Sequence, residues 1–433
     1  MSQDHLKDSD MWKVKDGLYL GLSSLIVFAS GFLIPVSFAK WATKESYGQF
    51  SYVISLMGLL NLFCLPGMND AITQGIARGE NGIWFPALRT RIRWTLIGIG
   101  VLWVIGGWFF VRKGPLGMVL FILAPFLLTY VLDSTKAFLS GHMAFRTVAC
   151  VNAGANFLPP LTVILLLAFG HHQVLWTSLG YFFTLFGFYT VVFLTILVVK
   201  RPTGTFSKET LRYGKHMSVI SSLGTFQGYV DKVIVGSLLG FVDLAHFSVA
   251  SLFQAPVKLL SWGVLYPQLL PNYAKISATD LRKEIAKWLK FTVFFGGLGM
   301  AGFLFAVKMI VELAFGESYH SVIPFAMLFI ISGFFLVPGM IFDIALRSQQ
   351  MKAEMYVLRI GQVIVTVLSL LILIPIFSLL GAVLADLISN ILYSFLGFFL
   401  NLRIGKKVEA EVSLAWPFRP SVTLPFRGSE LEK

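Results

Sequence analysis

The residues best suited to chemistry are charged side chains inside long apolar segments. Lys258 lies near the middle of the apolar segment 247–273, and no Asp or Glu occurs within four positions of it. A charge at the centre of a membrane span costs about 2.5–3.5 kcal/mol on insertion scales, so such residues usually have a function. Lys258 is therefore predicted to bind an anionic substrate in a polar cavity, or else to pair with a buried acid such as Asp231 or Asp386.

Other charged residues lie in neighbouring apolar segments. Asp231 and Lys232 are adjacent in the segment 218–239. Adjacent helical residues point about 100° apart, so these two side chains do not pair directly. We predict that Lys232 is a second substrate ligand and that Asp231 serves ion coupling. Asp386 and Asp70 are further candidates for ion coupling, because a carboxylate within a span can carry a proton or pair with a lysine.

Uncharged polar residues in the spans give a weaker indication of a substrate-binding site. Four amides are candidates for contact with sugar hydroxyls: Asn61, Asn152, Asn156 and Gln227. Such side chains also join neighbouring helices by hydrogen bonds, and the sequence does not separate these two roles. Three acid–base pairs have helical spacing near span ends and are predicted to be structural, namely Asp133/Lys136, Asp343/Arg347 and Lys308/Glu312.

No sequence pattern indicates an enzyme, a metal site or a bound cofactor. The seven His residues are scattered, and the pair His171-His172 has no carboxylate near it in the sequence. No P-loop or G-x-S-x-G motif occurs in a usable context. The net charge is +13, but the basic residues lie between apolar segments, which indicates membrane topology and excludes a nucleic-acid-binding face.

The composition predicts the elements that must position these residues. Of 433 residues, 56% are hydrophobic and 13% are charged, against roughly 25% charged in soluble domains. We predict an all-α polytopic membrane protein, since the connections are short and the alternating pattern of barrel strands is absent. Twelve segments are long enough to span a bilayer: 18–39, 50–75, 94–111, 118–139, 148–169, 174–199, 218–239, 247–273, 291–313, 322–343, 357–378 and 379–400.

The basic residues predict the orientation of these spans. With the N-terminus in the cytoplasm, 28 of the 35 Lys and Arg residues fall on the cytoplasmic side and four fall outside, so both termini are expected to be cytoplasmic. The segments 76–93 and 275–290 are expected to form amphipathic helices at the inner surface. We predict a six-helix bundle over 1–200, a second over 201–400, and a cytoplasmic tail over 401–433.

A short internal repeat supports this division into two pseudo-symmetric bundles. The stretch 49–53 (QFSYV) enters the second span and 246–250 (HFSVA) enters the eighth, 197 residues later. Six spans in each half make the two repeats parallel, and transporters built in this way bind their substrate between the halves. The same offset places Asn61 opposite Lys258.

Several stretches carry a resemblance to a known family. They are 229–240 (YVDKVIVGSLLG), 247–250 (FSVA), 47–51 (YGQFS) and 315–319 (FGESY). With the twelve spans, they make residues 15 to 400 resemble the multidrug, oligosaccharidyl-lipid and polysaccharide exporter superfamily, specifically its polysaccharide-transport branch of Wzx-type O-antigen flippases. The family usually has a small residue and then an aromatic where this chain has Ala245-His246-Phe247.

The resemblance implies a function for the chain. It implies transfer of an undecaprenyl-diphosphate-linked oligosaccharide, an O-antigen or related polysaccharide repeat unit of lipopolysaccharide biosynthesis, from the cytoplasmic to the periplasmic leaflet of a bacterial inner membrane. Implied partners are the lipid-linked glycan, membrane lipids, and a polysaccharide polymerase and chain-length regulator. In the related lipid II flippase, cavity cations serve the diphosphate, and Lys258 resembles such a cation. That flippase has two further spans, which are absent here.

The sequence leaves three alternatives to a flippase. A drug or cation antiporter of the same superfamily would typically carry an acidic site in its N-terminal half, but the span 18–39 contains no charge. An O-antigen polymerase would be expected to have a large external loop with charged catalytic residues, and the predicted external connections are all short. A non-transporting scaffold would not explain a lysine in the middle of a span.

Overall fold

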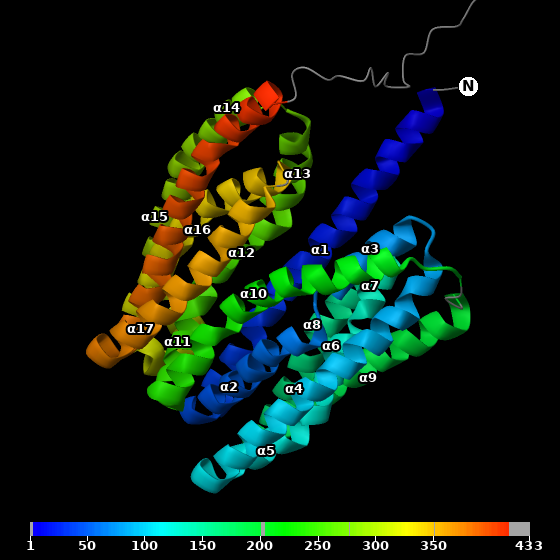
Figure 1. Cartoon of the computed structure of the whole chain (residues 1–433). Coiled ribbons are helices and arrows are strands. Elements are labelled where there is room, and N and C mark those ends of the chain that lie inside the picture. Colours follow the sequence, from blue (N-terminus) through cyan, green and yellow to red (C-terminus); the bar gives the residue numbers. More distant parts are fainter. Residues whose placement is uncertain (1–2, 201–203, 277, 350, 415–433) are drawn as a thin grey trace, which may run out of the picture.

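A computed structural model describes residues 3–200, 204–276, 278–349 and 351–414, and their regular structure is entirely helical (Figure 1). The expected all-α polytopic membrane fold is therefore confirmed. The tail predicted over 401–433 is described only to Leu414, as the end of a helix, and the rest of it lies outside the described residues.

Nine helices form the first part of the chain. They are α1 (Gln3–Trp41), α2 (Lys44–Leu60), α3 (Met68–Ala77), α4 (Trp84–Lys113), α5 (Pro115–Leu123), α6 (Leu128–Leu132), α7 (Ser134–Gly141), α8 (Phe145–Ala168) and α9 (Val174–Lys200). Short 3₁₀ turns extend or connect some of them, at Asn61–Cys64, Asn81–Ile83 and Ala124–Leu127. Helices α5, α6 and α7 together occupy the span predicted at 118–139.

Eight helices follow in the second part. They are α10 (Lys208–Leu238), α11 (Phe241–Ser251), α12 (Ala255–Leu259), α13 (Tyr266–Lys275), α14 (Ala278–Phe291), α15 (Gly297–Phe315), α16 (Ile323–Ser348) and α17 (Lys352–Leu414). Two π-helical turns, Leu260–Leu265 and Thr292–Gly296, join α12 to α13 and α14 to α15. Further 3₁₀ turns occupy Leu252–Gln254 and Glu317–Val322.

Most of the predicted spans agree with these helices. Nine segments of the described chain are long and apolar enough to cross a membrane, and the ninth, Ala353–Leu402, covers the last two predicted spans. It is divided at Ser378, whose φ of 54° breaks the helix between them. The spans predicted at 218–239 and 247–273 are helical, as α10 and α11–α13, but are not among the nine. These are the segments that carry Asp231, Lys232 and Lys258.

The start of the third span differs from the prediction. Helix α4 begins at Trp84, ten residues before the predicted span, and continues without a break to Lys113. The segment 76–93 is therefore not a separate surface helix, and that prediction was wrong. The second amphipathic segment agrees with the prediction: it is α14, which buries Leu281 and Ile285 and exposes Lys283 and Lys287.

Arg91 explains why α4 begins early. Only 1% of its surface is exposed, although the sequence suggested a cytoplasmic loop. Its Nε and Nη2 donate to the carbonyl oxygens of Cys64 (2.7 Å) and Tyr130 (2.5 Å), and its Nη1 donates to Oδ1 of Asn69 (2.6 Å). These acceptors lie beside the break after α2, where Leu65 has a φ of 51° and Pro66-Gly67 follow. Arg91 thus binds backbone carbonyls that the helix interruptions leave without partners.

Three apolar cores show how the helices are grouped. One core, which we call the shared core, contains residues from both parts of the chain, such as Phe50 and Phe247. A second core lies within the first part, around Trp84, and a third lies within the second part, around Tyr273. Figure 1 shows the corresponding shape: two groups of helices meet near α2 and α11 and diverge toward α3 and α14.

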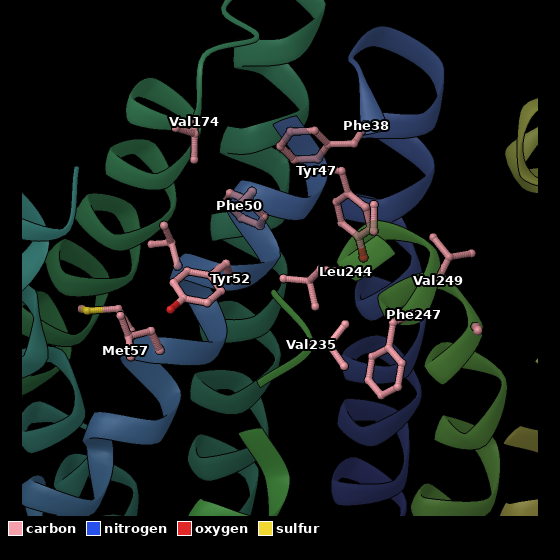
Figure 2. Packing of buried hydrophobic residues seen from close by; sticks show 14 of the residues in the cluster. Phe38, Tyr47, Phe50, Tyr52, Met57, Val174, Val235, Leu244, Phe247 and Val249 are labelled. Atoms are coloured by element: carbon pink, nitrogen blue, oxygen red, sulfur yellow. The ribbon is translucent and has the colours of Figure 1, made fainter. Parts of the chain in front are cut away.

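The shared core closes one end of the molecule. Phe38 of α1, Tyr47 and Phe50 of α2, and Leu244 and Phe247 of α11 are all buried there (Figure 2). Lys44, at the start of α2, donates to the carbonyl oxygen of Ser318 in the second part of the chain (2.5 Å). The connections at this end are those predicted to be external, so the two groups diverge toward the predicted cytoplasmic side.

Reporter fusions test this orientation. Reporters placed after Lys200 and Lys290 should give a cytoplasmic signal, and reporters near Gly170 and Ser318 should give a periplasmic one, because the basic residues favour the first pair of sites. Alkaline phosphatase and green fluorescent protein fusions measure the two sides independently. A periplasmic signal after Lys290 would contradict the predicted arrangement of the second part.

Candidate functional site

Helix α10 lies between the two groups of helices and positions the central charges. Its first half packs on α3, where the backbone at Met217 lies so near Gly67 that a side chain there would overlap it. Its second half packs on α2 and α17. Gln227 donates to the Thr366 hydroxyl of α17 (2.9 Å), and Thr366 shares a further hydrogen bond with Ser389 (2.6 Å). Gln227 therefore joins helices in this structure.

Four of the predicted charged residues lie near enough to one another to interact electrostatically. Asp231 interacts electrostatically with Lys232, Lys258 and Asp386, and Lys232 interacts with Lys258. We call these four residues the charge quartet. With all four ionised, its net charge is zero, which lowers the cost of holding the charges away from water.

Within the charge quartet, Lys258 is the least constrained member. Its side chain is exposed, and it forms no hydrogen bond or ion pair within 4 Å among the described residues. The close pairing with Asp231 or Asp386 that the sequence left open is thus not formed. Asp231, by contrast, is partly buried and accepts a hydrogen bond from the backbone N–H of Lys232 (2.7 Å). An exposed, unpaired ammonium group can bind an anion without first breaking a contact.

Asp386 has partners that its sequence context does not indicate. One carboxylate oxygen, Oδ2, accepts hydrogen bonds from Gln254 (2.9 Å), Ser332 (2.5 Å) and Asn390 (3.2 Å). These three side chains are almost fully buried and come from three separate segments of the chain. Only Asn390, four residues after Asp386, could have been inferred from helical spacing. The side-chain oxygen of Gln254, Oε1, has no hydrogen-bond partner and is buried beside this carboxylate.

The remaining predicted site residues lie outside the charge quartet. Asn61 opens the 3₁₀ turn after α2, and its buried Oδ1 has no hydrogen-bond partner. Asn156 donates to the carbonyl oxygen of Asn152 in the same helix, α8 (2.8 Å), so these amides satisfy each other locally. Asp70 is exposed in the first turn of α3 and interacts electrostatically with Arg347 of α16. The structure therefore gives no direct support to these four as ligands.

The three predicted structural pairs are confirmed. Asp133 binds Lys136 (2.7 Å), and Lys308 lies 3.8 Å from Glu312. Asp343 is fully buried and binds Arg347 (3.0 Å), as its spacing predicted. It also binds Arg359 of α17 (2.7 Å), which the sequence alone did not indicate.

The internal repeat has a physical counterpart. Helices α2 and α11 begin at Lys44 and Phe241, with the same 197-residue offset as the repeat. Ser51 and Ser248, which are equivalent in the repeat, share a hydrogen bond between their buried hydroxyl groups (2.7 Å). The two repeats therefore meet through their own equivalent residues, inside the shared core.

A cysteine pair at these positions should report closure of this end. In a variant without the native Cys64 and Cys150, Ser51→Cys and Ser248→Cys should form a disulfide on mild oxidation, because the two hydroxyl groups are already in contact. The measurement is the shift on a non-reducing gel after proteolysis between the two halves. Either single cysteine variant is the control, and failure of the pair to cross-link would contradict the shared core.

Comparisons with known proteins agree with this architecture. An uncharacterized membrane protein of Methanocaldococcus jannaschii is 22% identical over 91% of this chain and 99% of its own. Among solved structures, an inward-facing multidrug resistance MATE family transporter of the MOP superfamily matches 89% of this chain and 96% of its own, with a TM-score of 0.68 and 16% identity. The lipid II flippase MurJ, in an inward closed conformation, matches 93% and 94%, with a TM-score of 0.67 and 14% identity.

A protein-family model matches most of the chain. The model described as polysaccharide biosynthesis protein matches residues 38–324, which include most of the shared core, all of α10 and the segment that carries Lys258. The two transporter folds above have the arrangement expected from the resemblance to the exporter superfamily. The chain is a multi-pass membrane protein of the exporter-superfamily fold, and it belongs to the polysaccharide biosynthesis protein family.

Proposed function

We propose that the protein is a flippase for an undecaprenyl-diphosphate-linked oligosaccharide, an O-antigen or related polysaccharide repeat unit. It moves the lipid-linked glycan from the cytoplasmic to the periplasmic leaflet of a bacterial inner membrane. The observation that carries this proposal is the exposed, unpaired Lys258 within a neutral charge quartet.

The chemistry of the substrate explains the need for such a site. Glycan hydroxyl groups and a diphosphate are costly to transfer through hydrocarbon, the diphosphate far more so. Lys258 and Lys232 supply two positive charges for the diphosphate, and Asp231 and Asp386 balance them while the site is empty. Arrival of an anion makes the site negative overall, which favours uptake of a cation or proton by the acids. Asp231 and Asp386 are therefore the residues we propose for ion coupling.

The grouping of the apolar cores supports alternating access. One end is closed by the shared core, while each group of helices has a separate core at the other end. Separate cores allow the two groups to move as units about the shared core, as in other transporters with two repeats. With the predicted orientation, this conformation would receive substrate from the cytoplasmic side.

A leaflet assay tests the proposed function. Purified protein is placed in proteoliposomes with a polyprenyl diphosphate that carries a defined oligosaccharide, and a membrane-impermeant glycosidase is added outside. The protein should increase the fraction of glycan that the enzyme removes, and collapse of an imposed proton or sodium gradient should slow that increase. Extrusion of a cationic dye without any glycan transfer would instead favour the antiporter alternative.

A further inference from the structure

A second site lies in the C-terminal group of helices, next to Lys258. A cavity of about 790 Å³ lies between the α12–α13 segment, the α14–α15 segment and α16 (Figure 1 shows these elements side by side). Its lining is mostly apolar and aromatic, and includes Leu260, Phe291, Phe295, Phe303, Phe334 and Val337. We call this cavity the apolar groove. Its volume lies within the usual range for small-molecule sites.

The apolar groove is open toward the membrane. Leu260, Phe291 and Phe295 line it and are each at least half exposed. The helix on its outer side, α15, also exposes Phe305 and Leu313 almost completely, as expected for a lipid-facing surface. A hydrocarbon chain can therefore enter the groove sideways from the bilayer.

Backbone irregularity and glycines shape the groove. Both π-helical turns of the described chain border it, and such turns are frequent at functional sites. Gly296, at the end of the second π-helical turn, and Gly299 and Gly302 of α15 line the groove, about 4.5 Å apart along the helix. A Cβ atom at Gly299 or Gly302 would meet no other atom within 4 Å, so these positions leave open space that packing does not use.

The position of the groove relates it to the charge quartet. Pro256 and Val257 line its inner end and directly precede Lys258 in α12. From Pro256 to Gln268, the lining extends about 18 Å along the helix, roughly half of a bilayer's hydrocarbon core. An apolar groove of this length that ends beside an unpaired cation fits an amphiphile with an anionic head and a long apolar chain.

We propose that the apolar groove binds the first isoprenoid units of the lipid-linked substrate while the diphosphate lies at Lys258. This inference rests on the proposed function and adds to it a specific site for the lipid chain. The open spaces beside Gly299 and Gly302 accept the methyl branches that a polyprenyl chain carries on every isoprenoid unit. The aromatic lining packs against the double bonds of the same chain. A straight acyl chain has no methyl branches and would leave these spaces unfilled.

Photolabelling tests the groove without requiring transport. The probe is a polyprenyl diphosphate with a diazirine on its isoprenoid chain, added to purified protein in vesicles of phosphatidylcholine. Labelled peptides should map to α12–α15. Gly299→Leu and Gly302→Leu should each reduce labelling by roughly tenfold, because the added side chain fills the space that the probe needs. Gly107→Leu is the matched control, since Gly107 in α4 has equally open space.

The outcomes separate this inference from the proposed function. Unlabelled polyprenyl diphosphate should compete with the probe, whereas the same concentration of phosphatidylglycerol should not. Equal labelling of Gly302→Leu and Gly107→Leu, both eluting as folded protein, would overturn the inference, and so would effective competition by phosphatidylglycerol. If labelling behaves as expected but wild-type protein transfers no glycan in the leaflet assay, the proposed function fails and the isoprenoid site stands.

Discussion

Cells that express Lys258→Ala should lose surface glycan although the protein remains in the membrane at normal abundance. Lys258 has no close partner among the described residues, so its removal leaves no acid newly without an ion pair. What it removes is the charge available to the diphosphate. Hydrogen bonds to charged groups contribute about 1.5–3 kcal/mol, so we expect the transfer rate to fall roughly 10- to 150-fold. Surface glycan normalised to membrane protein is the measurement.

Further variants separate binding from charge balance. Lys258→Arg should retain export because the positive charge is kept, and Lys258→Glu should lose it. Lys308→Ala is the matched control, since Lys308 is an exposed lysine in a span of the same half. If Lys258→Ala instead lowers abundance and Asp231→Asn or Asp386→Asn restores it, Lys258 only neutralises a buried acid. Full export by a stable Lys258→Ala variant would remove this residue from the mechanism.

Gly48→Val should stop transport for a different reason, by preventing closure at the shared core. A Cβ atom at Gly48 of α2 would lie 1.7 Å from the carbonyl oxygen of Phe241 at the start of α11. The helices can only meet in this way if position 48 has no side chain. Overpacking costs about 1–3 kcal/mol, which favours the conformation open at this end by roughly 5- to 150-fold.

Accessibility measures this shift. In the Gly48→Val background, the cysteine pair at positions 51 and 248 should no longer cross-link, and Lys258→Cys should react faster with a membrane-impermeant thiol reagent added outside. Export should fall at least about tenfold with normal protein abundance. Gly107→Val serves as control because a side chain there meets open space. Normal cross-linking with Gly48→Val would show that α2 and α11 do not need this contact.

The fold was largely predictable because it depends on the lengths of the apolar segments and on the positions of the basic residues between them. Both are local properties of the sequence. The break at residue 378 also followed from local signals, since the predicted spans 357–378 and 379–400 meet there. The start of α4 did not, because Arg91 looks like part of a basic loop between Arg89 and Arg93. Its burial depends on two backbone carbonyls from distant segments. Only one of the three acceptors of Arg91, Asn69, is a side chain, and main-chain acceptors leave no partner residue type to recognise.

The candidate site was predictable only in part for a related reason. Charges stand out in apolar segments, so all four members of the charge quartet could be named in advance. Gln254 and Ser332 could not, because each is an ordinary polar residue until the fold brings it to Asp386. The amides Asn152 and Asn156 show the reverse: they stand out in the sequence, and in the structure Asn156 donates to the carbonyl oxygen of Asn152 within one helix.

The contact between Ser51 and Ser248 has a consequence for the symmetry of the molecule. A residue can touch its own equivalent only on a two-fold axis, as in a homodimer with an isologous interface. At this contact the chain therefore has the geometry of a two-fold symmetric dimer interface. In a homodimer, every substitution appears on both sides of the axis. A single chain with two repeats is free of that restriction, so it can carry Lys258 on one side and the neutral Asn61 at the corresponding position, and hold a ligand that has no symmetry itself.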